Sequence, residues 1–386
     1  MLTVYLIIFW LLALAALLMQ LKLTRTAKLS LIALSYVLLV LFVGLRWEVG
    51  NDWAQYYDYY RHISSLRDRY DVFLMGQGYG VGYRLISVWI KNTGLPFAGF
   101  NLMYAAIYLG LIFLSFKHDN FKISGWLILQ LYAPFILGLM GTMRQVMAIA
   151  ICMFSIRYLL SKDWRRFLLC VCFATAFHIS ALVFLFAWPL ARIRLTFRRM
   201  SILVVVVFLA LVLDVGSLAT KYGVLYASAF NNADLDQKLL LEQAATSEQF
   251  EFAAGSRVTV LWTVSQLALL LLFIACFRLF SEEADRLYFK LYLTGVVLLL
   301  LLSGPMLVLA ERASLYFTLF QMHLIALPTR RIKRSLLRQL YCAALIAVCL
   351  ARLCTGLYLQ HPRDFLPYKG VFINQDVRRD AGWFWR

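Results

Sequence analysis

Long apolar segments alternate with short polar ones along the chain, and this alternation predicts the fold. The apolar segments are about 16 to 24 residues long, close to the length that a helix needs to cross a bilayer. Because no water satisfies the backbone there, we expect helices, and the alternating pattern of a transmembrane β-barrel is absent. We predict spans at residues 2–21, 29–45, 97–116, 124–140, 145–160, 200–214, 258–277, 288–304, 312–328 and 339–357.

Two further segments depart from this pattern. Residues 81–93 are amphipathic and contain Arg84 and Lys91, so we expect an interfacial or half-inserted helix. Residues 167–191 lie between basic clusters. If they cross the membrane once, the clusters at 192–199 and 329–338 fall outside, against the bias of basic residues toward cytoplasmic loops. A re-entrant or short helical hairpin that bends near His178 keeps both clusters inside, although its arms are short for a full crossing.

The predicted fold is therefore all-α: one polytopic transmembrane domain, 1–386, with about 10–12 transmembrane helices. The first span has no basic residue before it and several after it, the reverse of a signal peptide, so we expect an extracytoplasmic N-terminus. On this topology the first extracytoplasmic loop with its interfacial helix is 46–96, and the second large loop is 215–256. The tail 358–386 is also extracytoplasmic.

Composition agrees with a membrane protein and limits its partners. The chain of 386 residues is 62% hydrophobic and only 15% charged, whereas a soluble domain carries roughly a quarter charged residues. The net charge of +18 arises from short basic clusters between apolar segments, which the membrane explains, so we exclude nucleic acid. The seven cysteines lie in or beside apolar segments without metal-ligand spacing, so we expect no disulfide and no metal site.

The segment 44–57 holds the densest group of reactive and polar residues. Arg46 directly follows an apolar segment, Gly50 and Asn51 favour a turn, and Asp52 comes next. The aromatic rings nearby have flat faces that can stack on sugars: Trp47, Trp53, Tyr56 and Tyr57. An interfacial aromatic belt with snorkelling charges explains the same residues, and both interpretations stay open.

Charged and polar groups recur at other segment ends. Arg144 and Gln145 open the span at 145–160, Glu311 and Arg312 follow the break at 304–305, and His178 lies at the predicted bend. Three arginines at helix ends can converge on a pyrophosphate, because guanidinium binds phosphate oxygens bidentately. For each arginine alone, a snorkelling or ion-paired side chain explains the position as well, and His178 alone fits a satisfied core histidine. Asp234-Leu235-Asp236 is only a weak metal–nucleotide-sugar signal.

These residues resemble the EpsG-like family of bacterial polysaccharide proteins, relatives of Wzy-type O-antigen polymerases. The resemblance rests on Gly44-Leu45-Arg46, Gly50-x-Asp52 and Tyr56, on the Arg144-Gln145 helix start, and on Ala174-x-x-Phe177-His178-x-Ser180-Ala181. Glu311-Arg312 and Pro367-Tyr368 are similar too. The chain departs at Asn51-Asp52-Trp53, where Thr-Asp-Tyr is more typical, which leaves the hydroxyl contacts of the loop open.

The resemblance implies a GT-C-like, metal-independent glycosyltransferase without a cofactor in the bacterial inner membrane. It would join oligosaccharide repeat units carried on undecaprenyl pyrophosphate at the outer face. Expected partners besides the lipid bilayer are a chain-length regulator and a flippase. Arg46, Arg144 and Arg312 would bind the pyrophosphate, and the rings of segment 44–57 together with Gln145 would bind sugar.

The acceptor hydroxyl needs a base or an orienting acceptor, for which the candidates are Asp52, His178 and, after them, Glu311. Two other classes of function remain. One is a lipid-linked sugar flippase or transporter, although the internal repeats common in transporters are not evident. The other is a membrane O-acyltransferase, which would also use a histidine within the membrane.

Overall fold

A computed structural model of the chain describes residues 2–63, 79–116, 121–194, 196, 199, 257–302, 307–360 and 362–374. Most of those residues are helical, and the only β-type pairs among them are two isolated bridges. The chain divides into two compact units, residues 1–182 with 325–386 and residues 183–324, which are described in turn. The predicted span 200–214, the loop 215–256 with its two aspartates, and the end of the tail lie outside the described residues.

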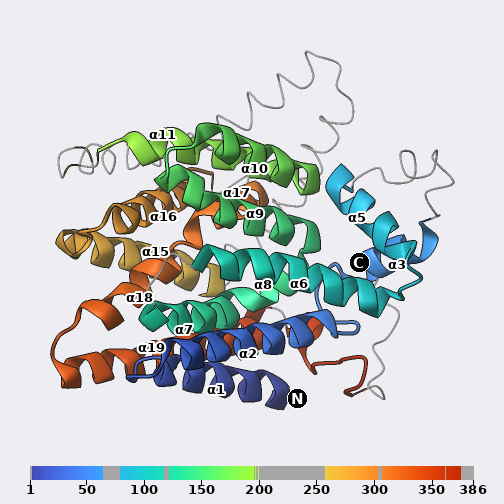
Figure 1. Cartoon of the computed structure of the whole chain (residues 1–386), viewed down its shortest axis with the longest axis horizontal. Helices are drawn as coiled ribbons and strands as arrows, with labels where there is room; N and C mark the ends of the chain where they lie inside the picture. The colour runs from blue at the N-terminus through green and yellow to red at the C-terminus, as the bar shows by residue number, and fades with distance from the viewer. Residues whose placement is uncertain are drawn as a thin grey trace. The chain divides into compact units, whose positions relative to one another are not determined.

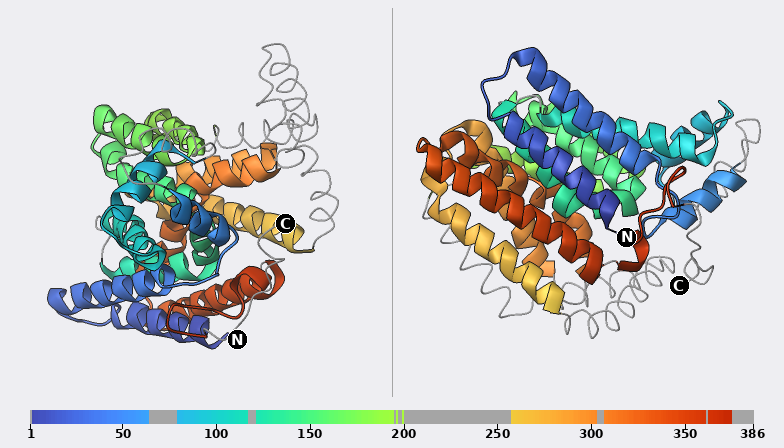
Figure 2. Two further views of the ribbon diagram at one scale, coloured as in Figure 1. Left: turned by 90° about the vertical axis from the view of Figure 1, so that its right-hand side faces the viewer. Right: turned by 90° about the horizontal axis from the view of Figure 1, so that it is seen from below.

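The first unit is built on long apolar helices that pack side by side. α1 (Thr3–Leu18) packs on α2 (Arg25–Gly44), α2 on α6 (Phe97–Ser115), α6 on α9 (Met143–Leu160), and α9 on α10 (Trp164–Phe177). Figure 1 shows this order, and α1 and α2 stay adjacent in both views of Figure 2. Their outward faces are apolar: Leu34 on α2 is 67% exposed, as expected of a side chain that faces lipid.

Two short helices stand at one end of this unit. α3 (Trp53–His62) and α5 (Val81–Lys91) both contact α6. α5 matches the amphipathic helix predicted at 81–93: Val81, Leu85 and Trp89 form an exposed apolar stripe at four-residue spacing, while its other face is buried. Its position at a membrane interface stays a prediction. Lys91 joins the two helices, since its Nζ donates to the carbonyls of Tyr60 at 2.5 Å and Arg61 at 2.9 Å.

Two predicted spans depart from a regular α-helix. The span 124–140 consists of α7 (Phe121–Gln130), a π-helical turn (Leu131–Phe135) and α8 (Ile136–Gly141). Pro134 lies in that turn and has no amide hydrogen to donate, so the helical ladder changes register there. The span 312–328 is also two helices, α17 (Leu307–Thr318) and α18 (Gln321–Arg331).

The remainder of the first unit comes from the end of the chain. α19 (Ser335–Thr355) is followed by a π-helical turn (Gly356–Gln360) and the short α20 (Pro362–Phe365). Tyr341 of α19 donates to the Ile325 carbonyl at 2.6 Å, which attaches α19 to α18. Residues 364–374 then run back along the end of α2 (Figure 1, red).

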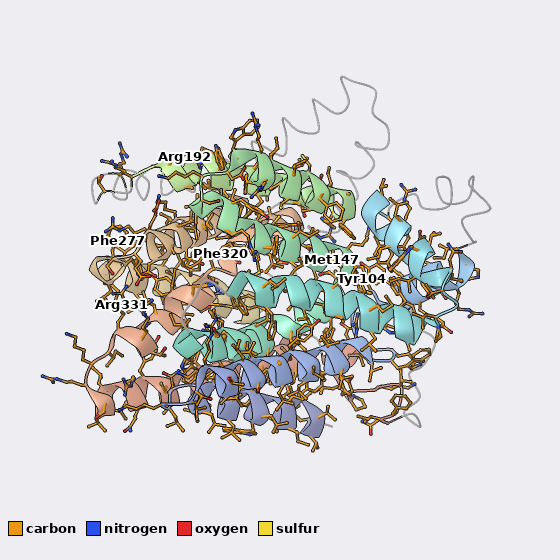
Figure 3. All side chains as sticks on the ribbon, in the orientation of Figure 1. Tyr104, Met147, Arg192, Phe277, Phe320 and Arg331 are labelled. Carbon is orange, nitrogen blue, oxygen red and sulfur yellow. The ribbon has the colours of Figure 1, made fainter. Side chains whose placement is uncertain are left out.

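The second unit contains α11 (Ala187–Arg192), α15 (Arg257–Ala275), α16 (Glu283–Leu302) and α17. α16 packs against each of the other three. Phe320, labelled in Figure 3, has its ring centroid 5.7 Å from that of Tyr288 on α16, nearly parallel to it. Tyr292 donates to the Gln266 side chain at 2.9 Å, so a polar contact joins α16 to α15.

Four helices of the described chain are long and apolar enough to cross a membrane, namely α2, α6, α9 and residues 335–358. Four shorter apolar helices accompany them, at 3–18, 123–133, 179–192 and 265–275. These helices identify an all-α membrane protein. The larger number of spans, the hairpin near His178, the GT-C likeness and the sidedness of both termini stay predictions.

Candidate functional site

Arg46 anchors the loop that follows α2. Its side chain is 2% exposed, and all three nitrogens donate to backbone carbonyls. Nε donates to Val49 at 3.2 Å, Nη1 to Val43 at 2.6 Å, and Nη2 to Met140 at 3.0 Å. The first of these carbonyls lies in the loop, the second in the last turn of α2, and the third in the last turn of α8. Arg46 therefore holds the loop against the corner where α8 meets α9.

Gly50 lies against the same corner. Its φ of +108° is in the region that favours glycine, and a Cβ there would lie 2.9 Å from the Met140 carbonyl oxygen. Arg46 and Gly50 thus contact the same carbonyl group from one loop. The geometry explains why an arginine and a glycine stand four residues apart in this segment.

Arg144 projects from the first turn of α9, directly after that corner. Its Nε and its backbone nitrogen both lie 3.5 Å from the Tyr56 hydroxyl, and its guanidinium carbon lies 5.0 Å from the centre of the Tyr79 ring. The amino terminus of an 18-residue helix carries partial positive charge, to which the arginine adds a full one. Two tyrosines thus flank a strongly positive position.

Asp52 precedes α3 and is half-buried. Its charge acts on both tyrosines that flank Arg144. Burial raises the pKa of Tyr56 above its usual value, the Asp52 carboxylate raises it further, and Arg144 opposes the shift. Asp52 and Arg144 likewise act in opposite directions on the pKa of Tyr79, which burial raises. A carboxylate and a guanidinium therefore lie within electrostatic reach of the same two hydroxyls.

The predicted sugar-binding rings pack mainly on one another. Trp53 stacks on Tyr57 with ring centroids 5.0 Å apart, and Trp47 meets both rings edge-on. Trp53 and Tyr56 are 4% and 2% exposed, and Gln145 is 4% exposed. Trp47 and Tyr57 are half-buried. Of the five predicted sugar contacts, only these last two present a substantial part of the side chain to solvent.

His178 lies where α10 ends, as the sequence predicted of a helix break. Its backbone is extended, with φ −152° and ψ 123°. The Ser180 amide donates to Nδ1 at 3.3 Å, and the Ser180 hydroxyl is 2.6 Å from the same nitrogen. An amide N–H can only donate, so Nδ1 accepts, and the neutral ring carries its proton on Nε2.

Helix α5 connects the end of α10 to the tyrosines around Arg144. A Cβ on Gly80 would lie 2.5 Å from the carbonyl oxygens of Ala176 and Phe177, so the two chains approach as closely as a glycine allows. Tyr79 precedes this contact, and Tyr83, fully buried, follows it with its ring centroid 5.3 Å from that of Tyr56. Asp52, Arg144 and His178 therefore belong to one connected region of the first unit.

Glu311 and Arg312 belong to α17 of the second unit, and both are exposed. The predicted convergence of Arg312 with Arg46 and Arg144 stays a prediction. Within the described residues, no group of three or more His, Cys, Asp or Glu side chains is placed to hold a metal ion.

Helices long and apolar enough to cross a membrane, with a cluster of arginine and tyrosine at one end of the first unit, define an all-α membrane protein with a polar site. The chain belongs to the EpsG family, whose family model matches residues 29–369. The match extends from before Arg46 to Lys369, and membership indicates a polysaccharide-polymerase type of function. No curated protein and no solved structure matches the chain.

The sequence indicated Tyr79 and Tyr83 only as two of the many aromatic rings of residues 46–83 that can stack on sugar, and not as neighbours of Arg144. Residues 76–83 read Gly-Gln-Gly-Tyr-Gly-Val-Gly-Tyr, and glycines alternating around an aromatic residue signal a close approach of backbone segments. The same pattern could have identified the contact between α5 and α10. Glu48 and Lys369 form an ion pair with each other across more than 300 residues of sequence, and no such pattern marked either of them.

Proposed function

We propose that the protein is a polysaccharide polymerase that joins oligosaccharide repeat units carried on undecaprenyl pyrophosphate, at the outer face of the inner membrane. Family membership supports the class of function, and the position of Arg144 supports the chemistry. A guanidinium at the amino end of a helix, flanked by the Tyr56 hydroxyl and the Tyr79 ring, suits the binding of a departing pyrophosphate.

In the proposed reaction, an acceptor sugar hydroxyl attacks the anomeric carbon of the growing chain. A new glycosidic C–O bond forms, the bond from that carbon to the pyrophosphate breaks, and undecaprenyl pyrophosphate leaves with the bonding electrons. The proton of the hydroxyl passes to a base. Negative charge develops on the leaving oxygen, where Arg144 supplies positive charge without a metal ion.

Asp52 suits the role of base better than His178. The Nδ1 lone pair of His178 accepts from Ser180, so the ring presents an N–H donor rather than an acceptor to a ligand at Nε2. In this assignment Asp52 accepts the proton and His178 donates a hydrogen bond to a sugar oxygen. Trp47 and Tyr57, the more accessible rings, contact sugar.

Arg46 has a different principal role in this proposal. Its three nitrogens hold the carbonyls of Val43, Val49 and Met140, so it supports the loop beside Arg144. Two of its five N–H groups are not used in these three hydrogen bonds, so the predicted contact between Arg46 and the pyrophosphate stays a prediction. A chain-length regulator and a flippase are the partners that this reaction implies.

Purified protein in lipid vesicles, supplied with a lipid-linked repeat unit, tests the proposal. Wild type should form products with two or more repeats and release undecaprenyl pyrophosphate. Asp52→Asn should lose about 10²- to 10⁴-fold in rate, as general bases do, and His178→Ala about tenfold, as one lost hydrogen bond does. Arg144→Lys keeps the charge but not the planar fork, and should impair product formation strongly.

Arg25→Lys, at the exposed far end of α2, is the matched control and should leave the rate unchanged. Wild type that moves the lipid-linked unit across the bilayer without extending it would instead be a flippase. Transfer of acetyl groups at unchanged chain length would indicate an O-acyltransferase. Either result contradicts the proposal.

A further inference from the structure

The segment after α20 lies along the loop after α2, although more than 310 residues separate them. We call residues 364–371, which begin in the last turn of α20, the C-terminal strap, and residues 45–52 the first loop. The Trp47 amide donates to the Lys369 carbonyl at 2.9 Å, and the Val371 amide donates to the Leu45 carbonyl at 2.9 Å. The Gly50 amide donates to the Asp364 carbonyl at 3.0 Å. Three backbone hydrogen bonds therefore run the length of the first loop.

Side-chain contacts attach the strap to helices α1 and α2. The Tyr368 ring stacks on Phe42 of α2 with centroids 4.8 Å apart, and its hydroxyl donates to the Phe42 carbonyl at 2.6 Å. Tyr5 of α1, whose ring meets that of Tyr368 edge-on, donates to the Phe365 carbonyl at 2.9 Å. The strap is thus attached to two membrane helices independently of its contact with the first loop.

One ion pair joins the strap to the first loop. Lys369 Nζ lies 2.6 Å from the Glu48 carboxylate, with side chains only 10% and 22% exposed. Glu48 has a φ of +52°, a left-handed conformation that is costly for a residue other than glycine. Glu48 adopts this conformation while Lys369 binds its carboxylate. An ion pair so little exposed is weakened less by solvent and salt than a surface pair.

The first loop is consequently held from two directions. The strap binds one edge, and Arg46 and Gly50 press the loop against the Met140 carbonyl, at the corner that precedes Arg144. Asp52 follows two residues after Gly50. Any shift of the loop at the strap therefore moves Asp52 relative to Arg144.

We infer that Glu48 and Lys369 are positioning residues for the reaction, and that the strap sets the register of Asp52 against Arg144. The inference rests on the proposed function, since it concerns the rate of the same step. Displacing a reacting group by about 1 Å costs about 10²-fold in rate. Loss of the ion pair should therefore lower kcat strongly while leaving KM for the lipid-linked unit nearly unchanged.

Polymerisation by three variants tests the inference. Lys369→Met removes the charge and should lower kcat by about 10- to 100-fold. Lys369→Arg keeps the charge and should keep most of the rate. The exchange Glu48→Lys with Lys369→Glu should polymerise faster than either single change. Lys333→Met, on an exposed lysine outside the strap, is the control and should match wild type.

A second measurement follows the strap without relying on activity. Val49 is fully buried, so the Val49→Cys variant should react slowly with a maleimide, whereas the Asn51→Cys variant, changed at an exposed position, should react fast. Mass spectrometry of the peptide that contains the introduced thiol reads the reaction with the native cysteines in place. Adding Lys369→Met should raise labelling at position 49 toward that at position 51.

The outcomes are separable. If wild type forms no polymer, the proposed function fails, and labelling still tests whether the strap holds the loop. Lys369→Met with wild-type kcat and unchanged labelling at position 49 overturns the inference. If Lys369→Met lowers the melting temperature and the rate while neither Lys369→Arg nor the exchange restores the rate, the ion pair is merely structural, which also overturns it.

Discussion

Replacing Arg46 with lysine separates an architectural arginine from one that serves the substrate. The guanidinium reaches three carbonyls in three different directions, of Val43, Val49 and Met140. A lysine ammonium is a compact point charge on a flexible stem and cannot span the same three acceptors. We expect it to keep one of the three hydrogen bonds and to lose two.

The cost follows from those two bonds. A hydrogen bond from a charged group contributes about 1.5–3 kcal/mol, so Arg46→Lys should lower the free energy of unfolding by about 3–6 kcal/mol. The melting temperature of a unit of this size falls by about 2–4 °C per kcal/mol. The expected fall is therefore at least about 6 °C, a large effect for one conservative substitution.

Thermal unfolding in detergent, followed by circular dichroism, measures this shift beside polymerisation by the same preparation. Arg25→Lys, at the exposed end of the same helix, should leave both quantities unchanged. Arg46→Lys should lower both, and polymerisation measured well below the new melting temperature should recover in part. A variant that melts within about 2 °C of wild type but polymerises more than about tenfold slower would refute the architectural role and favour a direct phosphate contact.

Two more predictions concern the same region. Gly50→Ala should destabilise the protein by about 1–3 kcal/mol, the cost of a strained backbone conformation. The reason is that φ is +108° and the new Cβ would lie 2.9 Å from the Met140 oxygen. Gly94→Ala, also at positive φ but with open space around it, is the control, and an equal loss of stability there would show that the contact with Met140 adds nothing. Burial raises the pKa of Tyr59 to about 12. Between pH 10 and 12 this tyrosine therefore binds fewer protons in the unfolded chain than in the folded one, and the free energy of unfolding should fall as pH rises. Tyr59→Phe should flatten that fall, and an unchanged pH dependence would contradict the raised pKa of Tyr59.

The helices themselves were largely predictable, because the length of an apolar segment is set by the bilayer. The prediction of 29–45 corresponds to Arg25–Gly44, 97–116 to Phe97–Ser115, and 145–160 to Met143–Leu160. The amphipathic pattern of 81–93 likewise gave Val81–Lys91. The change of helical register at Pro134 was missed because the span was assigned by hydropathy, which records burial rather than hydrogen-bond register, although a proline within a helix signals such a change.

The site was predictable only residue by residue. Arg46 stands out in the sequence because a charge follows an apolar segment, yet its partner Met140 is 94 residues away and contributes a carbonyl, which every residue has. The same limit applies to Trp53 and Tyr56: aromatic composition shows what can stack on a sugar, but not that these rings are already covered by Tyr57 and Tyr83.

Close backbone approach connects these observations. Gly50 meets the carbonyl that ends α8, and Gly80 meets the carbonyls that end α10. The ends of two helices are thereby brought against segments that carry Asp52 and Tyr79. Tyr79 and Tyr56, which follows Asp52 by four residues, are the tyrosines that flank Arg144. A helix end has carbonyls without intrahelical partners, and the Met140 carbonyl in the last turn of α8 accepts a hydrogen bond from Arg46. Arg144 differs because it projects from the opposite kind of helix end, where amides rather than carbonyls lack partners. That polarity gives the two arginines separate roles: the carbonyl ends bind Arg46 as part of the scaffold, and the amide end places Arg144 where an anion is stabilised.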